Sequence, residues 1–263
     1  MSNKIAIIVG SGAVENAWEP VLKAFRNIWG EQVDENDANF LFAKQIYLLR
    51  IYAGFNDDLS KKNLQIEQEQ VNDLKEFICH YLSLYQINGL IKPRKEFVKV
   101  LDKFVFCNRL NKFSIITTNW DTVIDKKADE VVQLVYDDLE SAQCFHIHGR
   151  LDNPSKLYLP SEISKENYRS EIENREFGLI SYETLQYLKQ ANQIVMYGIS
   201  LDPLDAELNQ ILSTTFSVSK ALQEIVVVNP DSARLRKRVE YLVFPRKGLQ
   251  IKCFHPGNLD VEV

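Results

Sequence analysis

The sequence predicts an α/β fold: a Rossmann-like, mainly parallel sheet with helices on both faces and a helical insertion after the first strand. Three observations favour this class. The apolar run at residues 5–9 ends at Gly10 and is typical of a buried parallel strand. Beyond residue 113, short apolar runs alternate with helical patterns. Between these regions lie roughly a hundred residues of mostly helical pattern, more than a crossover connection needs.

The composition is that of a globular protein. The chain has 263 residues, of which 45% are hydrophobic and 25% are charged. We therefore expect a single domain over residues 1–263, with a helical subdomain inserted at approximately residues 31–110. The net charge of −5 provides no basic footprint, so direct binding to nucleic acid is not expected.

The cysteines and the N-terminus exclude several classes. No two of the four cysteines have CxxC spacing, which argues against a zinc ribbon and against a disulfide framework. The N-terminal apolar run is too short for a signal peptide, and a membrane span needs about 20 apolar residues. The sequence therefore predicts a cytoplasmic protein that does not enter a membrane.

The chain between the first two predicted strands is mostly helical, and the predicted insertion is part of it. Apolar and aromatic side chains recur at helical spacing over residues 17–29, 40–55 and 71–85, and a further helix is expected at 95–106. The polar run at residues 57–70 is interpreted as an exposed loop within the insertion.

The rest of the chain is expected to alternate between strands and helices. The predicted strands lie at residues 113–118, 131–136, 143–148, 194–197, 224–228 and 249–254. The predicted helices lie at residues 178–190, 206–215 and 232–242, after a polar segment at 152–175. This alternation implies parallel strands covered by helices on both faces.

Residues suited to handling a nucleotide follow five of these strands. In an open parallel sheet, ligands bind outside the carboxyl ends of the strands, so these positions are the candidate site. They are Gly10-Ser11-Gly12-Ala13, Thr118-Asn119-Trp120-Asp121, His148-Gly149, Gly198-Ile199-Ser200 and Asn229-Pro230-Asp231.

Each motif also has a purely structural interpretation. The glycines could form only a turn, and Asn119 or Asp121 could cap the following helix. Ser200 could cap the next segment, Asn229 could shape its turn, and His148 could be a satisfied structural residue. Trp120 and Tyr197 are expected to pack rather than to stack on a ligand. His146 and His148 lie at strand spacing with no third ligand nearby, so no metal site is expected.

Taken in order, the motifs resemble those of the sirtuin superfamily. That family has Gly-Ala-Gly after its first strand, where this chain has Gly10-Ser11-Gly12. Its Asn-x-Asp, His-Gly, Gly-x-Ser-Leu and late Asn are matched in the same order by Asn119-Trp120-Asp121, His148-Gly149, Gly198-Ile199-Ser200-Leu201 and Asn229. The resemblance spans nearly the whole chain.

Two differences from the sirtuin motifs indicate which branch of the superfamily the chain resembles. The zinc module of sirtuin deacylases needs two CxxC pairs, which these cysteines cannot supply. The family's Pro-x-Phe-Arg after the glycine loop is missing from residues 13–18. The chain is therefore more similar to the bacterial sirtuin-like effectors that destroy NAD+ in antiphage (antiviral) defence.

The resemblance implies an NAD+ glycohydrolase that releases nicotinamide and ADP-ribose, with NAD+ as substrate and no metal. His148 would be the general base, Asn119 would bind the nicotinamide-side ribose or water, and Asp121 would orient the carboxamide. The other residues assigned to NAD+ are Gly10, Ser11, Gly12, Ala13, Thr118, Gly198, Ser200 and Asn229. The alternatives are a protein deacylase or ADP-ribosyltransferase, and a non-catalytic nucleotide-binding module.

An enzyme that destroys NAD+ would be toxic if always active, so regulation by homo-oligomerisation or by a partner is expected. The aromatic residues Phe40, Phe42, Tyr47 and Tyr52 form a candidate interface, with core packing as the alternative. The family suggests a hexameric ATPase of the HerA type or an Argonaute-like protein as partner.

Overall fold

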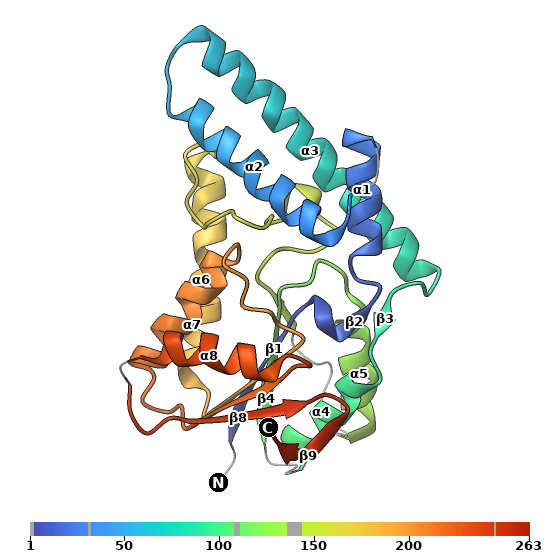
Figure 1. The fold of residues 1–263 in the computed structure, drawn as a ribbon, viewed down its shortest axis with the longest axis vertical. Helices are drawn as coiled ribbons and strands as arrows, with labels where there is room; N and C mark the ends of the chain where they lie inside the picture. Colours follow the sequence, from blue (N-terminus) through green and yellow to red (C-terminus); the bar gives the residue numbers. More distant parts are fainter. Residues whose placement is uncertain (1–2, 31–32, 108–110, 136–143, 245) are drawn as a thin grey trace.

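A central sheet organises the molecule (Figure 1). The computed structural model describes residues 3–30, 33–107, 111–135, 144–244 and 246–263. In this part of the chain the sheet has the order β5-β4-β1-β6-β7-β8-β9. The strands are β1 (Lys4–Val9), β4 (Lys112–Thr117), β5 (Cys144–His146), β6 (Gln193–Tyr197), β7 (Glu224–Val228), β8 (Gln250–His255) and β9 (Asn258–Glu262).

The strand order is that of a Rossmann-like fold, which confirms the predicted class. All neighbouring pairs are parallel except β8 with β9. When the six parallel strands are numbered along the chain, their spatial order is 3-2-1-4-5-6. The order reverses between β1 and β6, and that switch point is where such sheets bind ligands. The antiparallel edge strand β9 was not predicted.

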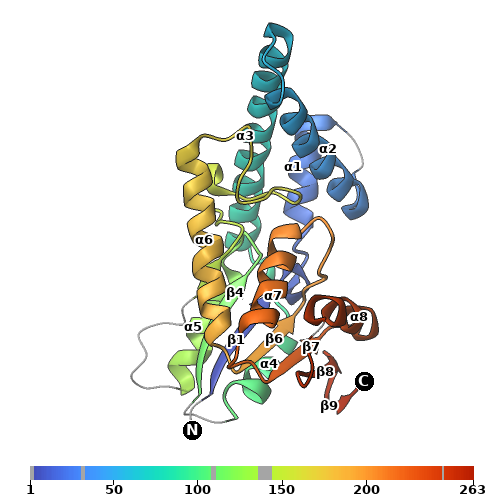
Figure 2. The same cartoon turned by 90° about the vertical axis from the view of Figure 1, so that its left-hand side faces the viewer.

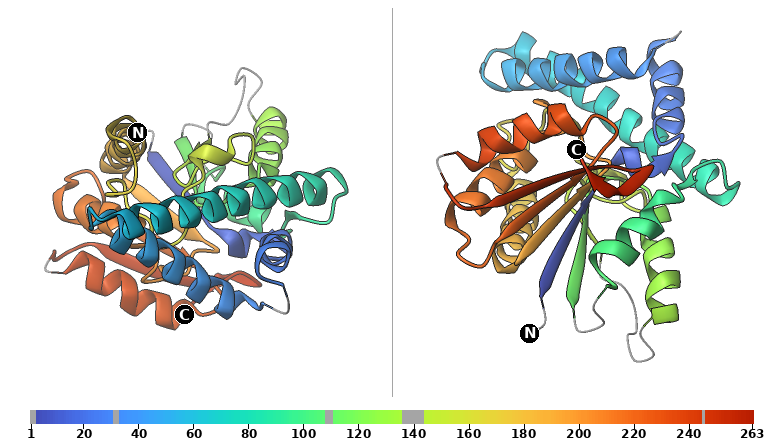
Figure 3. Two further views of the ribbon diagram at one scale, coloured as in Figure 1. Left: turned by 90° about the horizontal axis from the view of Figure 1, so that it is seen from above. Right: turned by 60° about the horizontal axis from the view of Figure 1, so that its bottom comes forward.

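Both faces of the sheet are buried, because alternate residues of each strand enter different cores. In β1, Ile5, Ile7 and Val9 belong to one core, while Ala6 and Ile8 belong to the other. Two sets of helices cover the two faces (Figures 2 and 3). The first core receives α4 (Glu96–Phe104) and α5 (Val123–Val135), and the second receives α6 (Glu171–Gln190), α7 (Ala206–Val218) and α8 (Ser232–Val243).

The insertion after β1 contains α1 (Glu19–Trp29), α2 (Glu35–Ala53) and α3 (Asp58–Ile87), which rise above the sheet in Figure 1. Fully buried apolar side chains hold them together. The Phe25 and Phe42 rings of α1 and α2 meet edge-on at 4.7 Å, and Leu74 and Ile78 of α3 join the same core. A short antiparallel pair, β2 (Val14–Glu15) with β3 (Lys92–Pro93), joins the two ends of the insertion.

Two predicted elements were wrong. The predicted strand at residues 131–136 is the end of helix α5, as far as residue 135; residue 136 lies outside the described residues. Its β-branched residues suggested a strand, but Ile124, Ala128 and Val131 lie three to four residues apart and face the core as one stripe.

The predicted loop at residues 57–70 is the first half of α3. This part of the helix projects beyond the sheet, so its polar side chains face solvent on most sides without ending the helix (Figure 1). Asp57 begins the helix as its N-cap, and its Oδ1 accepts a hydrogen bond from the Ser60 backbone N–H at 2.9 Å.

The other predicted strands match β1, β4, β5, β6, β7 and β8 to within two residues, except that residue 143 lies outside the described residues. Among the described helices, none is both long enough and apolar enough to cross a membrane.

Candidate functional site

A cavity of about 420 Å³ lies at the switch point of the sheet. Nine of the eleven residues predicted to form the site line it, whereas Gly10 and Ala13 do not. The nine are Ser11, Gly12, Thr118, Asn119, Asp121, His148, Gly198, Ser200 and Asn229. The topology therefore brings together residues from five separate strand ends.

The helical insertion supplies part of the cavity wall, which the sequence did not indicate. Trp18 directly precedes α1, and Val21 lies in its first turn. Glu35 and Asn39 lie in α2, and Leu82 lies in α3. No motif marks these positions, because their role depends on how the insertion folds back over the strand ends.

The glycine loop is shaped by contact with the loop after β6. The Gly10 N–H donates to the Tyr197 carbonyl at 3.1 Å and the Gly12 N–H donates to the Gly198 carbonyl at 3.0 Å. The Ala13 N–H donates to the Gly10 carbonyl. These three N–H groups are therefore already occupied and are not free to bind a phosphate. The loop after β1 packs closely against the loop after β6, which explains why both loops contain glycine.

Gly198 has no room for a side chain. Its φ is +65°, and a Cβ would lie 2.4 Å from the backbone nitrogen of Ala13. We expect Gly198→Ala to lower the free energy of unfolding by about 3 kcal/mol or more, or to prevent folding. The matched control is Gly178→Ala in the middle of α6, where nothing lies within 4 Å of an added Cβ. That change should stabilise the protein by roughly 0.5–1 kcal/mol. Urea denaturation measures both, and equal effects would contradict this account.

Asn119 is buried and has a free donor. Its backbone N–H donates to Thr117 Oγ1 at 3.0 Å, and its carbonyl oxygen lies 2.8 Å from His146 Nδ1. Its side-chain Nδ2 is buried and has no hydrogen-bond partner among the described residues. An unpaired buried amide is costly, so a ligand that accepts from Nδ2 would recover that energy.

His146 is a structural residue that supports Asn119. Strand β5 ends at His146, so His148 lies beyond the strand and the alternation of side chains along a strand does not apply to this pair. His146 Nε2 lies 2.9 Å from Asp125 Oδ1, while Nδ1 reaches the Asn119 carbonyl. These two contacts fix the orientation of the ring beside Asn119.

His148 lies in the cavity wall with its ring against Tyr158, and the two stacked rings are 5.3 Å apart. Its Nε2 lies 3.3 Å from Asp205 Oδ1, and no hydrogen bond to this nitrogen is formed by the described residues. Burial disfavours the imidazolium, but the Asp205 carboxylate, together with the Thr118 backbone and Glu162, outweighs burial and raises the pKa of His148 above its usual value. Asp205 was missed because it lies seven residues beyond Gly198, outside any motif.

Asp121 combines a structural role with a perturbed carboxyl. Its Oδ1 accepts from the Val123 N–H at 3.1 Å at the start of α5, as the helix-cap interpretation predicted. The side chain is also almost completely buried and lines the cavity. Burial raises the pKa of Asp121 to about 6, although the hydrogen bond from Val123 opposes the shift.

The remaining predicted residues play mixed roles. The Asn229 amide donates to the Ile199 carbonyl and accepts from the Asp231 N–H, so its side chain shapes the turn. Ser200 is exposed at the cavity rim. Tyr197 packs against Phe97 and Trp120 packs against Phe42, as expected. Trp120 also lines the cavity and donates to the Tyr158 carbonyl.

Over the described ranges, no three His, Cys, Asp or Glu side chains are grouped as a metal site would need. No known protein-family model matches the chain. No curated protein matches it significantly either.

Proposed function

We propose that the chain is an NAD+ glycohydrolase that uses the cavity at the switch point. One observation carries this proposal: His148 and Asn119 line the same cavity with buried nitrogens to which the described part of the chain offers no hydrogen-bond partner. A buried donor and a buried base at the ligand-binding edge of a Rossmann-like sheet suit a nucleotide whose ribose is to be attacked. The sequence resemblance to NAD+-consuming sirtuin-like effectors agrees with this chemistry.

In the proposed reaction, the bond between the ribose C1′ and the nicotinamide nitrogen breaks, and nicotinamide leaves with the electron pair as a neutral molecule. Water adds to C1′ and loses one proton, so NAD+ and water give ADP-ribose, nicotinamide and a proton. His148 Nε2 would accept that proton, and Asn119 Nδ2 would hold the ribose or the water. The leaving group is already cationic, so the site needs no strong general acid.

The proposed contacts to the rest of NAD+ follow from the cavity lining. Ser11, Gly12 and Ser200 line the cavity, and we assign them to the pyrophosphate. Because the Gly12 N–H is occupied, the Ser11 and Ser200 hydroxyl groups are the more suitable donors. Asp121 would orient the carboxamide, whose amino group can donate to a carboxylate.

The direct test measures nicotinamide and ADP-ribose by chromatography after incubation of purified protein with NAD+ and no acyl peptide. Stoichiometric release of both products is expected. NAD+ that stays constant, with the protein alone and with a co-purified partner, would contradict the proposal. Release that requires an acylated peptide would instead favour a deacylase, and NAD+ binding without turnover would favour a regulatory nucleotide-binding module.

Asp205 is expected to set the pH dependence of this reaction. A base acts in its neutral form, so the rate falls as the pH drops through the pKa of His148. Asp205 raises that pKa, so Asp205→Asn should lower it and move the acidic limb of kcat/KM to lower pH. The profile is measured between pH 5 and 9. The control is Asp202→Asn, in the same cavity wall, where Oδ1 accepts from the Leu204 N–H instead. An acidic limb that stays in place in Asp205→Asn would contradict the assignment.

We also propose that activity is controlled by self-association or by a defence partner, such as a HerA-type ATPase. Phe42 is fully buried, so it belongs to the core of the insertion. Phe40 and Tyr47 of α2 are 68% and 62% exposed, and they remain available for an interface.

A further inference from the structure

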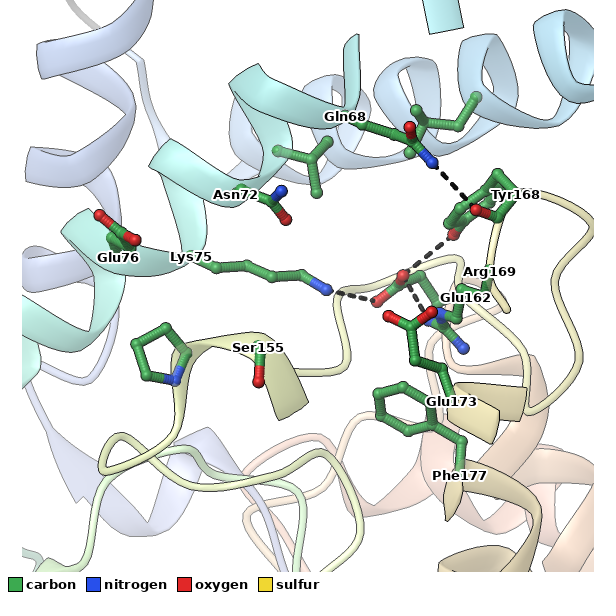
Figure 4. Close-up of a pocket in the computed structure, with 13 residues that line it drawn as sticks. Gln68, Asn72, Lys75, Glu76, Ser155, Glu162, Tyr168, Arg169, Glu173 and Phe177 are labelled. Atoms are coloured by element: carbon green, nitrogen blue, oxygen red, sulfur yellow. Dashed lines mark hydrogen bonds and ion pairs between the residues drawn. The ribbon is translucent and has the colours of Figure 1, made fainter. Parts of the chain in front are cut away.

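A second cavity, of about 480 Å³, lies between α3 and the segment 154–177 (Figure 4). No residue lines both this cavity and the one at the switch point. Its volume is within the range of small-molecule sites, which extends from about 300 to 1,000 Å³.

One carboxylate in the wall is already satisfied. Glu162 is 1% exposed, and it accepts hydrogen bonds from the Tyr168 hydroxyl at 2.9 Å and from the Leu159 N–H at 2.5 Å. It also forms an ion pair with Arg169, whose guanidinium lies 4.1 Å from the centre of the Phe177 ring. Arg169 therefore balances the charge of Glu162, although its buried Nη2 forms no hydrogen bond with the described residues.

Lys75 is the group that stays incompletely paired. Its side chain is 91% buried, since 9% is exposed, and it extends across the cavity toward Glu162 (Figure 4). The one partner that the described residues offer its ammonium group is Glu162 Oε2 at 3.7 Å, longer than a hydrogen bond. Burial lowers the pKa of Lys75, although the charge of Glu162 opposes the shift. Among the buried side chains of this wall, Arg169 and Lys75 face one carboxylate, which leaves one positive charge in excess when Lys75 is protonated. The exposed Glu173 carboxylate also attracts Lys75.

The rim of the cavity limits what can neutralise that charge. Glu76 and Glu173 line the cavity and are exposed, and Glu173 is held by Ser170 at the start of α6. Two carboxylates at the entrance repel a ligand with several negative charges. Asn72 and Gln68 also line the cavity and add uncharged polar groups.

We propose that this cavity is a second ligand site, which binds a small molecule through a single carboxylate that pairs with Lys75. The carboxylate supplies the one negative charge that the buried wall needs, and the acidic rim selects against phosphates with two charges. The remainder of the ligand would lie toward the rim, where the Asn72 and Gln68 amides and the carboxylates can receive its hydrogen-bond donors.

The test uses acetate as the minimal probe, acetamide as its uncharged counterpart and inorganic phosphate as the competing anion. The readout is the NMR signal of the Lys75 side-chain methylene next to the ammonium group, assigned by its loss in Lys75→Met. We expect acetate to shift this signal saturably, acetamide to leave it unchanged, and phosphate to bind more weakly than acetate. No shift with acetate at 100 mM, as an order of magnitude suited to weak anion sites, would overturn the proposal. A tighter response to phosphate would also overturn it.

A calorimetric titration with acetate provides the second arm. Lys75→Met keeps the length of the side chain and leaves the Glu162–Arg169 pair intact, and it should weaken acetate binding at least about tenfold. Lys75→Arg restores the charge and should recover binding. Lys61→Met, on the exposed part of the same helix, is the matched control and should bind as the wild type does. Equal affinity in Lys75→Met and wild type would overturn the proposal, and circular dichroism shows that each variant is folded.

Discussion

His148→Ala is expected to reduce NAD+ cleavage by about 100-fold or more, because general-base catalysis contributes roughly that factor. The imidazole lies in the cavity wall, where its buried Nε2 forms no hydrogen bond with the described residues and lies 3.3 Å from Asp205 Oδ1, so the substitution removes the proposed base. The loss should fall on kcat rather than on KM, because the proton transfer belongs to the transition state. The measurement is the initial rate of nicotinamide release at several NAD+ concentrations.

The matched control is His80→Ala, which removes an exposed imidazole from α3 and should leave the rate unchanged. Asn119→Ala should reduce the rate by about tenfold or more through the loss of one buried donor. Thermal unfolding of each variant separates loss of chemistry from loss of structure. If folded His148→Ala keeps its rate within a few-fold of the wild type, His148 is not the base.

The sheet could be predicted from the sequence because its signals are local. A run of five apolar residues ending at Gly10 has few interpretations other than a buried strand, and shorter or interrupted apolar runs mark five further strands. The prediction of a strand at residues 131–135 was wrong because a valine-rich segment fits a strand by propensity. The helix is defined by the stripe of Ile124, Ala128 and Val131, which begins before the predicted strand does.

The site could be predicted in part, for a topological reason. Parallel strands place their carboxyl ends at one edge, so Asn119, His148 and Gly198 had to meet there once the sheet was correct. The wall supplied by the insertion, with Asn39 and Leu82, depends on long-range packing that no local pattern encodes. The same is true of the hydrogen bonds that occupy the Gly12 N–H, because the loop after β6 makes them.

Asp121→Asn is expected to stabilise the protein at neutral pH. The pKa of Asp121 rises from 3.8 to about 6 on folding, so between these values the folded state binds more protons than the unfolded state. Stability therefore falls as the pH rises from 3.8 to about 6, and the full cost is present above pH 6. A shift of about two units corresponds to roughly 2–3 kcal/mol. Asparagine keeps the acceptor for the Val123 N–H and removes the buried charge.

Urea unfolding of wild type and Asp121→Asn between pH 4 and 8 measures this cost. The difference between the two should grow with pH and level off above pH 6, since the variant lacks the titrating group. The control is Asp57→Asn at the exposed start of α3, where hydrogen bonds with Ser60 lower the pKa of the carboxyl and the pH dependence has the opposite sign. A difference that stays constant from pH 4 to 8 would contradict the prediction. If the stabilised variant also loses NAD+ cleavage, the buried charge of Asp121 is retained for catalysis at the expense of stability, because the helix cap alone does not require a carboxylate.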